Sequence, residues 1–440
     1  MGGNLAVPNR FDWLLYGTLI FILTYDLPPV WTSVRFSPID NAVVQNPVSY
    51  HIYVVLLLIG TLFYALASVG FDLRIFGDCM RKEPLLWLLV LWIALSSLWA
   101  PELVATIKGS FDLIVMAMIA AVLVHRFSVA HIVAFGAAAY AVGTVLHGIF
   151  IVLLPNYGLS AGDWKGITAQ KNGLGHYSVL ACMLFFFAAR FFPRFRVVNY
   201  FFLSVNVVLV LGTASKTSLV RLVALPAMLI VFQVFRARRT LYGAVALAFV
   251  GGSVTMIAVV GNNIGPIAIA LGKDPRLSGR TQLWSASIDL IRKHPIFGNG
   301  FQSTFTDWFA PGRQVWQTVG FQLPNAHNAV LQAALDLGVV GAALLVALVI
   351  RVVVRGARVL RYVPGMVGMF PLVFAGEMVL YGITEAGIIN RNVDFLFFCI
   401  MVLESTTGRR DLLKVNSSPR AAHQPNRQRK IPLSATPTFS

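Results

Sequence analysis

The sequence predicts an all-α polytopic membrane protein with about 12 transmembrane helices. Of its 440 residues, 57% are hydrophobic and only 12% are charged, whereas about a quarter of the residues in an ordinary soluble domain are charged. The mean hydropathy is +0.73. Lys and Arg residues mostly flank apolar runs and form no continuous patch, so the net charge of +17 indicates membrane topology and not nucleic acid binding.

Each predicted helix corresponds to an apolar run that can cross the hydrocarbon core of a bilayer, which takes roughly 20 residues. The runs cover residues 11–27, 50–70, 84–99, 106–124, 130–154, 174–192, 196–213, 216–235, 241–260, 328–350, 366–387 and 393–405. The first and last runs are short, and only a polar TASKTS segment separates the seventh from the eighth. The sequence is therefore compatible with about 11 to 13 helices.

The distribution of basic residues predicts the orientation in the membrane. A cytoplasmic N-terminus places 22 of the 35 Lys and Arg residues on the cytoplasmic side, as the positive-inside rule requires. The segments 28–49, 156–173, 261–327 and 388–392 then face the periplasm of a bacterium, and the expected location is the inner membrane. The transmembrane domain is expected at 1–408, followed at 409–440 by a disordered basic cytoplasmic tail without an apolar pattern.

The 13 basic residues on the outer side run against the bias that sets the topology. An anionic substrate at the outer face would account for several of them. The predicted outer loop of residues 261–327 is the largest, and it holds the features on which the functional prediction depends.

Within that loop, residues 280–293 predict an amphipathic helix at the membrane surface. After Arg280, apolar side chains recur at near-helical spacing with polar side chains between them. These apolar positions are Leu283, Trp284, Ile288, Leu290 and Ile291. The pair His294-Pro295 ends the helix, because a residue before proline disfavours helical backbone, and a Gly-Asn-Gly turn follows at 298–300. The loop ends at His327, beside the start of the next membrane helix.

The order of these features resembles the O-antigen ligase family of membrane glycosyltransferases. The resemblance rests on Arg280, Trp284, HPIFGNGF at 294–301, AHN at 326–328 and LGVVG at 337–341, and the arrangement of spans extends it over most of the chain. It implies a fold of the broad GT-C glycosyltransferase class. It also implies a polysaccharide on undecaprenyl pyrophosphate as the donor, and a sugar hydroxyl of the lipid A-core oligosaccharide as the acceptor.

No cofactor and no catalytic metal ion are expected. His294 and His327 lack the short spacing of metal ligands, and no HExxH or DxD pair occurs on the outer side. Arginine could take the place of a metal ion, because its guanidinium group matches phosphate oxygens bidentately and stays charged.

Arg221 and Arg280 are the arginines that the resemblance assigns to the pyrophosphate. Arg221 lies inside the eighth span, where an unpaired cation is costly. From the residues alone it could instead snorkel to the outer headgroups or pair with an acidic residue of another span. The acidic candidates are Asp336, Glu377 and Glu385.

Arg280 begins the amphipathic helix, whose N-terminus adds oriented N–H groups for an anion. Alternatively, Arg280 is an ordinary charged residue on a solvated loop. Arg292 is a further candidate for substrate binding, although a basic polar face is also typical of an interfacial helix.

His327 is the candidate catalytic base. A histidine with an ordinary pKa can accept a proton from a hydroxyl near neutral pH. The residue alone fits a capping or packing role equally, and the resemblance favours catalysis. Asn325 and Asn328 could orient the imidazole or cap the following helix, and the pattern favours capping by Asn325, while Asn328 is also a candidate for substrate binding.

A second group of candidate substrate-binding residues precedes the sixth and eighth spans. Gln170, Lys171 and Asn172 lie in GITAQKNGLGHY at 166–177, which resembles the polar outer loop of the family, and Lys216 starts the eighth span. The glycines of this segment form no Walker A motif.

Three other functions remain open. An O-antigen polymerase would use the same donor and a lipid-linked repeat as acceptor. A protein O-oligosaccharyltransferase is disfavoured because no sizeable outer domain follows the last spans. A transporter of lipid-linked glycans would show related halves, which the sequence does not show.

Overall fold

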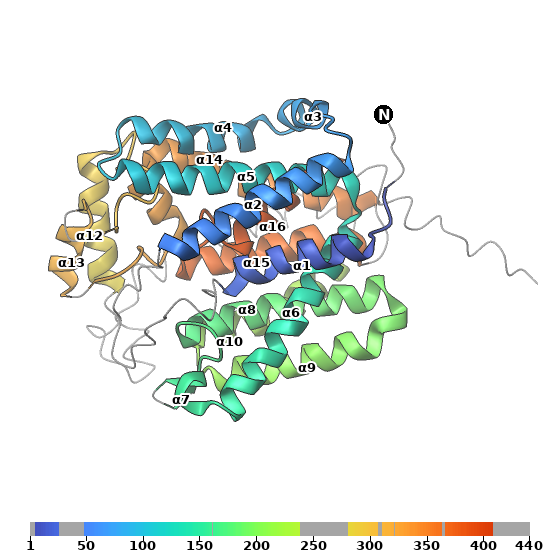
Figure 1. Ribbon diagram of the computed structural model, residues 1–440. Helices are drawn as coiled ribbons and strands as arrows, with labels where there is room; N and C mark the ends of the chain where they lie inside the picture. The colour runs from blue at the N-terminus through green and yellow to red at the C-terminus, as the bar shows by residue number, and fades with distance from the viewer. Residues whose placement is uncertain are drawn as a thin grey trace, which may run out of the picture.

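The computed structural model of this protein is a bundle of helices that run roughly side by side (Figure 1). It describes residues 5–25, 48–160, 162–237, 280–306, 310–320, 322–362 and 366–407. The elements in chain order are α1 (Arg10–Tyr25), α2 (Val48–Ser68), α3 (Arg74–Lys82), α4 (Pro84–Leu95), η1 (Ser96–Leu98), α5 (Leu103–Arg126), α6 (Val129–Val152), α7 (Pro155–Gly158), β1 (Leu159–Ser160), β2 (Asp163–Trp164), α8 (Lys171–Phe191), η2 (Pro193–Phe195), α9 (Arg196–Gly212), α10 (Lys216–Ala237), α12 (Arg280–Lys293), α13 (Arg313–Val319), α14 (Ala329–Tyr362), η5 (Val367–Met369), α15 (Phe370–Thr384) and α16 (Val393–Thr407).

Helices form at eleven of the twelve predicted spans, and the remaining span, 241–260, lies outside the described residues. Within the described part of the chain, 7 helices are long and apolar enough to cross a membrane, and Pro84–Leu98 and Phe370–Thr384 are shorter apolar helices. The protein is thus an all-α, multi-pass membrane protein. The total of about 12 spans stays a prediction, as do the orientation, the tail and the GT-C class.

The structure adds elements that the apolar pattern did not predict. The helices α3, α7 and α13 and the antiparallel pair β1–β2 lie in segments that were left without secondary structure. The tenth predicted span, 328–350, lies within α14, which continues beyond it to Tyr362. The carboxylate of Glu83, which is 0% exposed, pairs there with Arg351 and Arg355. The helix therefore continues beyond the apolar run because its arginines have a buried partner.

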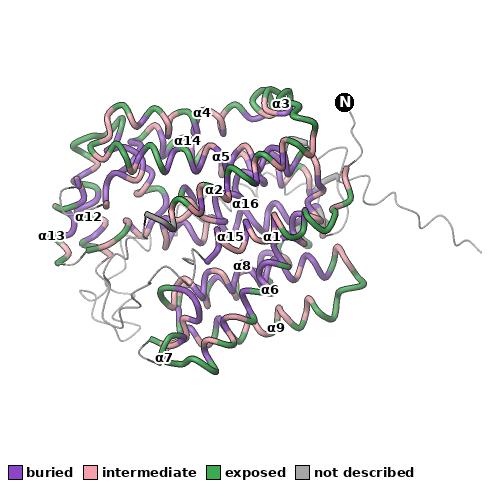
Figure 2. The backbone as a smooth tube through the Cα atoms, viewed as in Figure 1, coloured by how far each residue is buried: buried purple, intermediate pink, exposed green. Residues whose placement is uncertain are grey.

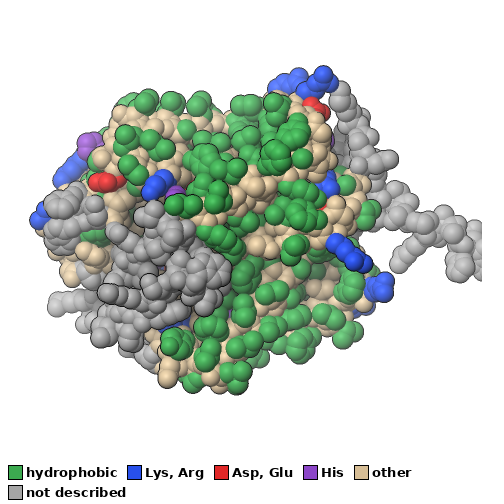
Figure 3. All heavy atoms as spheres, viewed as in Figure 1, with side chains coloured by type: hydrophobic (Ala, Val, Ile, Leu, Met, Phe, Trp, Pro, Cys, Tyr) green, Lys and Arg blue, Asp and Glu red, His purple; other side chains and the backbone are tan. Residues whose placement is uncertain are grey.

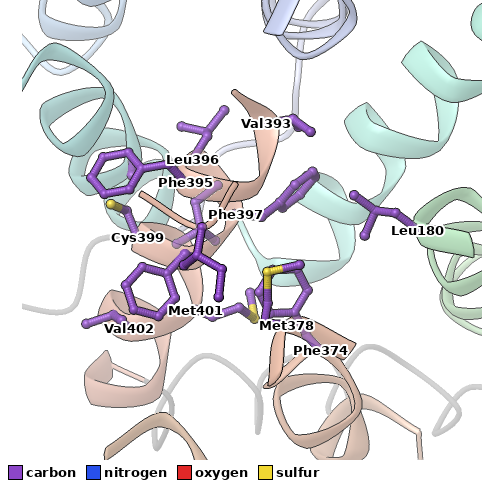
Figure 4. Packing of buried hydrophobic residues seen from close by; sticks show 14 of the residues in the cluster. Leu180, Phe374, Met378, Val393, Phe395, Leu396, Phe397, Cys399, Met401 and Val402 are labelled. Atoms are coloured by element: carbon purple, nitrogen blue, oxygen red, sulfur yellow. The ribbon is translucent and has the colours of Figure 1, made fainter. Parts of the chain in front are cut away.

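The core lies along α5, α8 and α16, and the peripheral helices show apolar faces to the surroundings (Figure 2). Of the most apolar stretch of α8, 78% is buried, against 17% for the stretch that contains α9. Phe374 and Met378 of α15 pack with Phe397 of α16 and Leu180 of α8 (Figure 4). Apolar side chains cover the middle of the molecule on the face shown in Figure 3, and charged side chains gather towards its two ends. This surface fits a bilayer around the middle of the bundle.

Candidate active site

The predicted amphipathic helix is present as α12, at one end of the bundle beside α13 (Figure 1). Its apolar side packs on protein: Leu283 and Leu290 form a small core with Val315 and Trp316 of α13. Ile288, which the pattern placed on this face, is 41% exposed. α13 and the start of α14 cover most of its apolar stripe, and the position of the helix at the membrane surface stays a prediction.

The HPIFGNGF segment fills a break in α14. Gly338 has φ +67° and ψ −172°, outside helical geometry. Backbone groups beside the break bond to the segment: Asn299 N donates to Leu335 O (2.9 Å), Gly300 N to Asp336 O (2.8 Å), and Val339 N to Pro295 O (2.8 Å). A helix break in a membrane protein needs such partners for its backbone.

Two indole groups complete this arrangement. Trp92 Nε1 donates to Leu337 O at 3.0 Å, and Trp99 Nε1 donates to Phe297 O at 3.0 Å. A side chain at Gly338 would overlap the carbonyl oxygen of Ile296, so glycine is required both by the left-handed φ and by the close approach. The loop after α12 is thereby held against residues 335–339 of α14, the helix that His327 precedes.

His327 pairs with Glu385, the residue that follows α15. Its Nδ1 lies 2.9 Å from Glu385 Oε2, and the side chains of both residues are 19% exposed. Burial raises the pKa of Glu385. The hydrogen bond to His327 and the charges of His327 and Arg280 together lower this pKa by more than burial raises it, so the pKa lies below its ordinary value. The carboxylate is therefore ionised and accepts the Nδ1 proton. This tautomer leaves the Nε2 lone pair as the basic site.

The backbone holds His327 in an unusual conformation. Its φ is +48°, in the left-handed region, which costs an ordinary residue roughly 1 to 2 kcal/mol. Asn325 Oδ1 accepts from His327 N at 2.9 Å, and Trp284 Nε1 donates to Ala326 O at 3.0 Å. Strained backbone that is fixed by such contacts is typical of functional sites.

Arg280 lies on the other side of Glu385. It begins α12, as predicted, and its Nη2 is 3.9 Å from Glu385 Oε1. The Arg280 side chain is 28% exposed, so the side chain is partly open to the surroundings. His327 and Arg280, 47 positions apart in the sequence, are thus joined through one carboxylate.

Arg221 is buried and 3% exposed. It pairs with Glu377 of α15, one of the three acidic partners that the sequence left open, and its Nη2 also lies 2.8 Å from His176 Nδ1. Asp336, another of the three, instead bonds to Thr304 and Gln332. The pairing of Arg221 with an acidic residue of another span, which the sequence left open as an alternative, is therefore present in the structure.

The candidates Lys171, Asn172 and Lys216 lie around the starts of α8 and α10. Lys171 Nζ pairs with Asp163 Oδ2 at 2.6 Å, and Asn172 Oδ1 accepts from Ser215 Oγ at 3.0 Å, beside the exposed Lys216. Gln170 is exposed and precedes α8. The structure brings this group together, and among the residues that it describes there is no contact between this group and the His327–Glu385 pair.

Arg292 and Asn328 have other surroundings than expected. Arg292 pairs with Asp289 on the exposed side of α12, about 18 Å along the helix axis from Arg280. Asn328 Oδ1 accepts from Val330 N and Leu331 N, both at 3.0 Å, so Asn328 caps α14. The preference for Asn325 as the cap was wrong, because Asn325 bonds to His327 N instead.

Sequence reasoning missed three functional candidates: His176, Asp394, and Glu385 as the partner of His327. Asp394 binds His176 at 2.9 Å inside the bundle, and both are at most 4% exposed. A signal was present, because a carboxylate inside an apolar span is costly and indicates a functional site.

The fold and the site define a multi-pass helical membrane protein with a histidine, a carboxylate and an arginine together at one end of the bundle. Residues 200–346 match the model of the family described as O-antigen ligase. This match confirms the resemblance to the O-antigen ligase superfamily, and its range includes Arg221, Arg280 and His327.

The chain is also similar to "Exopolysaccharide production protein ExoQ" of Rhizobium meliloti (strain 1021), with 28% identity over 107 residues. This alignment covers 23% of the chain and 24% of that protein, so it spans about a quarter of the relative's length.

Proposed function

We propose that this protein is an O-antigen ligase of the bacterial inner membrane, with its active site facing the periplasm. It would transfer a polysaccharide from undecaprenyl pyrophosphate to a sugar hydroxyl of lipid A-core oligosaccharide, without a metal ion or cofactor. The observation that carries this proposal is the 2.9 Å contact between His327 and Glu385, with Arg280 on the second oxygen of the same carboxylate.

His327 Nε2 accepts the proton of the acceptor hydroxyl as its oxygen attacks the anomeric carbon of the donor. The new C–O bond forms as the bond from that carbon to the phosphate oxygen breaks, and the pyrophosphate leaves with the electron pair. A single displacement of this kind inverts the anomeric configuration. Glu385 stabilises the imidazolium that forms at His327, and a positioned base of this kind contributes roughly 10²- to 10⁴-fold in rate.

Arg280 binds the pyrophosphate, on which negative charge grows as the bond breaks. Its side chain is partly exposed and lies at the N-terminus of α12, where oriented N–H groups also favour an anion. Arg221 would add a second contact from inside the bundle. Lys171, Asn172 and Lys216 are proposed to contact the polar part of a substrate, since they lie together at two helix starts.

A polymerase is the second candidate, and the relative named for exopolysaccharide production favours it. A polymerase shares the donor, the base and the arginines, and it differs only in taking a lipid-linked repeat as the acceptor. The chemistry proposed at His327 is therefore common to both functions.

A transfer assay distinguishes these functions: the purified protein is reconstituted in proteoliposomes and supplied with undecaprenyl pyrophosphate-linked polysaccharide. A ligase joins the polysaccharide to added lipid A-core and releases undecaprenyl pyrophosphate, also in the presence of EDTA. A polymerase lengthens a lipid-linked repeat and leaves lipid A-core unmodified. Movement of the lipid across the bilayer without release of the carrier would contradict both, and would show a transporter.

A further inference from the structure

A second cluster of ionisable side chains lies inside the bundle, along α15 from the proposed base. Four helices contribute to it: His176 from α8, Arg221 from α10, Glu377 from α15 and Asp394 from α16. Their exposures are 4%, 3%, 0% and 0%. Glu377 precedes Glu385 by 8 residues, about 12 Å along a helix axis. Charges buried in this way persist only where partners compensate them.

The hydrogen bonds of the cluster determine the proton position on His176. Arg221 Nη2 lies 2.8 Å from His176 Nδ1, and a guanidinium can only donate, so Nδ1 must be the unprotonated nitrogen. His176 Nε2 lies 2.9 and 3.1 Å from the two oxygens of Asp394, so it carries the proton and donates it there. His176 is therefore neutral, and Asp394 selects the tautomer that accepts from Arg221.

A neutral acceptor suits an arginine that must keep its charge. Glu377 already pairs with Arg221 Nη2 and offsets its positive charge. A second carboxylate in contact with Arg221 would give the pair a net negative charge, whereas the neutral ring nitrogen accepts a hydrogen bond from the guanidinium without adding charge. Tyr381 fixes the orientation further: its ring stacks on His176 with centroids 3.8 Å apart and lies 5.0 Å from Arg221 Cζ.

The Nε–H group of the Arg221 guanidinium is a hydrogen-bond donor that the contacts above do not use. Its Nε is buried and has no hydrogen-bond partner among the residues that the structure describes. Buried N–H groups without a partner are destabilising, so this atom indicates an acceptor outside the residues that the structure describes. An anionic phosphate oxygen is an acceptor that fits a guanidinium.

We propose that His176 is a positioning residue for the donor pyrophosphate: as a neutral, Asp394-bound ring, it holds Arg221 so that the Nε–H is available to a phosphate oxygen. The inference rests on the proposed function, since it assigns a part of the same donor site. His176 itself does not contact the reacting atoms.

The test compares the affinity of the purified full-length protein for undecaprenyl pyrophosphate with its affinity for undecaprenol. The ratio isolates the pyrophosphate contact from the binding of the lipid chain. His176→Phe keeps a ring to stack on Tyr381 and removes both nitrogens, so we expect the ratio to fall about tenfold or more. His176→Asn keeps an acceptor near the position of Nδ1, and its ratio is expected to stay within about threefold of wild type.

His131→Leu is the matched control. His131 is a histidine near the start of α6 that contacts Ser128 and Phe192, and its loss should leave the ratio unchanged. Each variant is measured on the monodisperse fraction from gel filtration, and His176→Leu replaces the phenylalanine variant if that variant does not fold. An unchanged ratio in His176→Phe or His176→Leu, or an equal loss in His176→Asn, would overturn the inference. A wild-type ratio near one would instead contradict the proposed function.

Discussion

Glu385 Oε2 accepts a 2.9 Å hydrogen bond from Nδ1 of His327, although the two residues are 58 positions apart in the chain. The pair joins the loop before α14 to the end of α15, at the end of the bundle that also carries α12 (Figure 1). Because the carboxylate fixes the imidazole with Nε2 unprotonated, this relationship turns a histidine at a helix start into a proposed base.

The first prediction concerns the carboxylate. Glu385→Gln removes the negative charge that stabilises the imidazolium and keeps the shape of the side chain, so the turnover number should fall by roughly 10²-fold. The affinity for undecaprenyl pyrophosphate should change little, since the phosphate contacts are assigned to the arginines. Turnover and binding assays on the same preparation check this, and normal turnover in the glutamine variant would remove Glu385 from the mechanism.

The second prediction concerns the guanidinium of Arg280. Arg280→Lys keeps a positive charge and loses the bidentate fork, so glycan transfer should fall by about 10²-fold. Arg81→Lys is the control, because Arg81 is an exposed arginine that pairs with Asp78 away from the site. If both variants transfer glycan at the wild-type rate, Arg280 is an ordinary surface charge.

The third prediction concerns the break in α14. Gly338→Ala places a Cβ on a residue with φ +67° and against the carbonyl of Ile296. Thermal unfolding in detergent should show a loss of at least about 1 to 2 kcal/mol, the usual cost of left-handed backbone for a side chain. Gly60→Ala in α2 is the matched control, since a Cβ there meets nothing within 4 Å. Equal unfolding temperatures for Gly338→Ala and the wild type would contradict the account of the break.

The fourth prediction concerns orientation. Ser285 is exposed on α12, whereas the nearby Ser303 is fully buried, so Ser285→Cys is the suitable reporter of the proposed periplasmic loop. In cells whose outer membrane alone is permeable, a membrane-impermeant thiol reagent should label Ser285→Cys and leave Ser418→Cys unlabelled. The reverse pattern of labelling would invert the topology.

The sequence predicted most of the helices because apolar runs and helical spacing are local properties. It missed α13, which has only 7 residues and is followed by Gly320 in the left-handed region, because a helix this short carries little periodic signal. It also did not show how far α14 continues beyond the apolar run, since the apolar pattern does not reveal that Glu83 is a buried partner of Arg351 and Arg355.

The candidate site was predictable only in part. Arg280 and His327 could be named from their local context, but their meeting through Glu385 depends on how α12, α14 and α15 pack. For Arg221, the sequence left three acidic partners open, and packing selected Glu377. Capping was equally ambiguous, since Asn325 and Asn328 are three residues apart, and only their hydrogen bonds in the structure separate their roles.

The central claim is that His327 is the base for glycan transfer, and single-turnover transfer by His327→Ala tests it most directly. The variant should insert and fold, because His327 is not the cap of α14, and alanine at its left-handed φ costs roughly 1 to 2 kcal/mol. It should bind undecaprenyl pyrophosphate-linked polysaccharide as the wild type does, since the arginines are unchanged, and it should transfer glycan at least 10²-fold more slowly. Transfer at the wild-type rate by the folded variant would contradict the account.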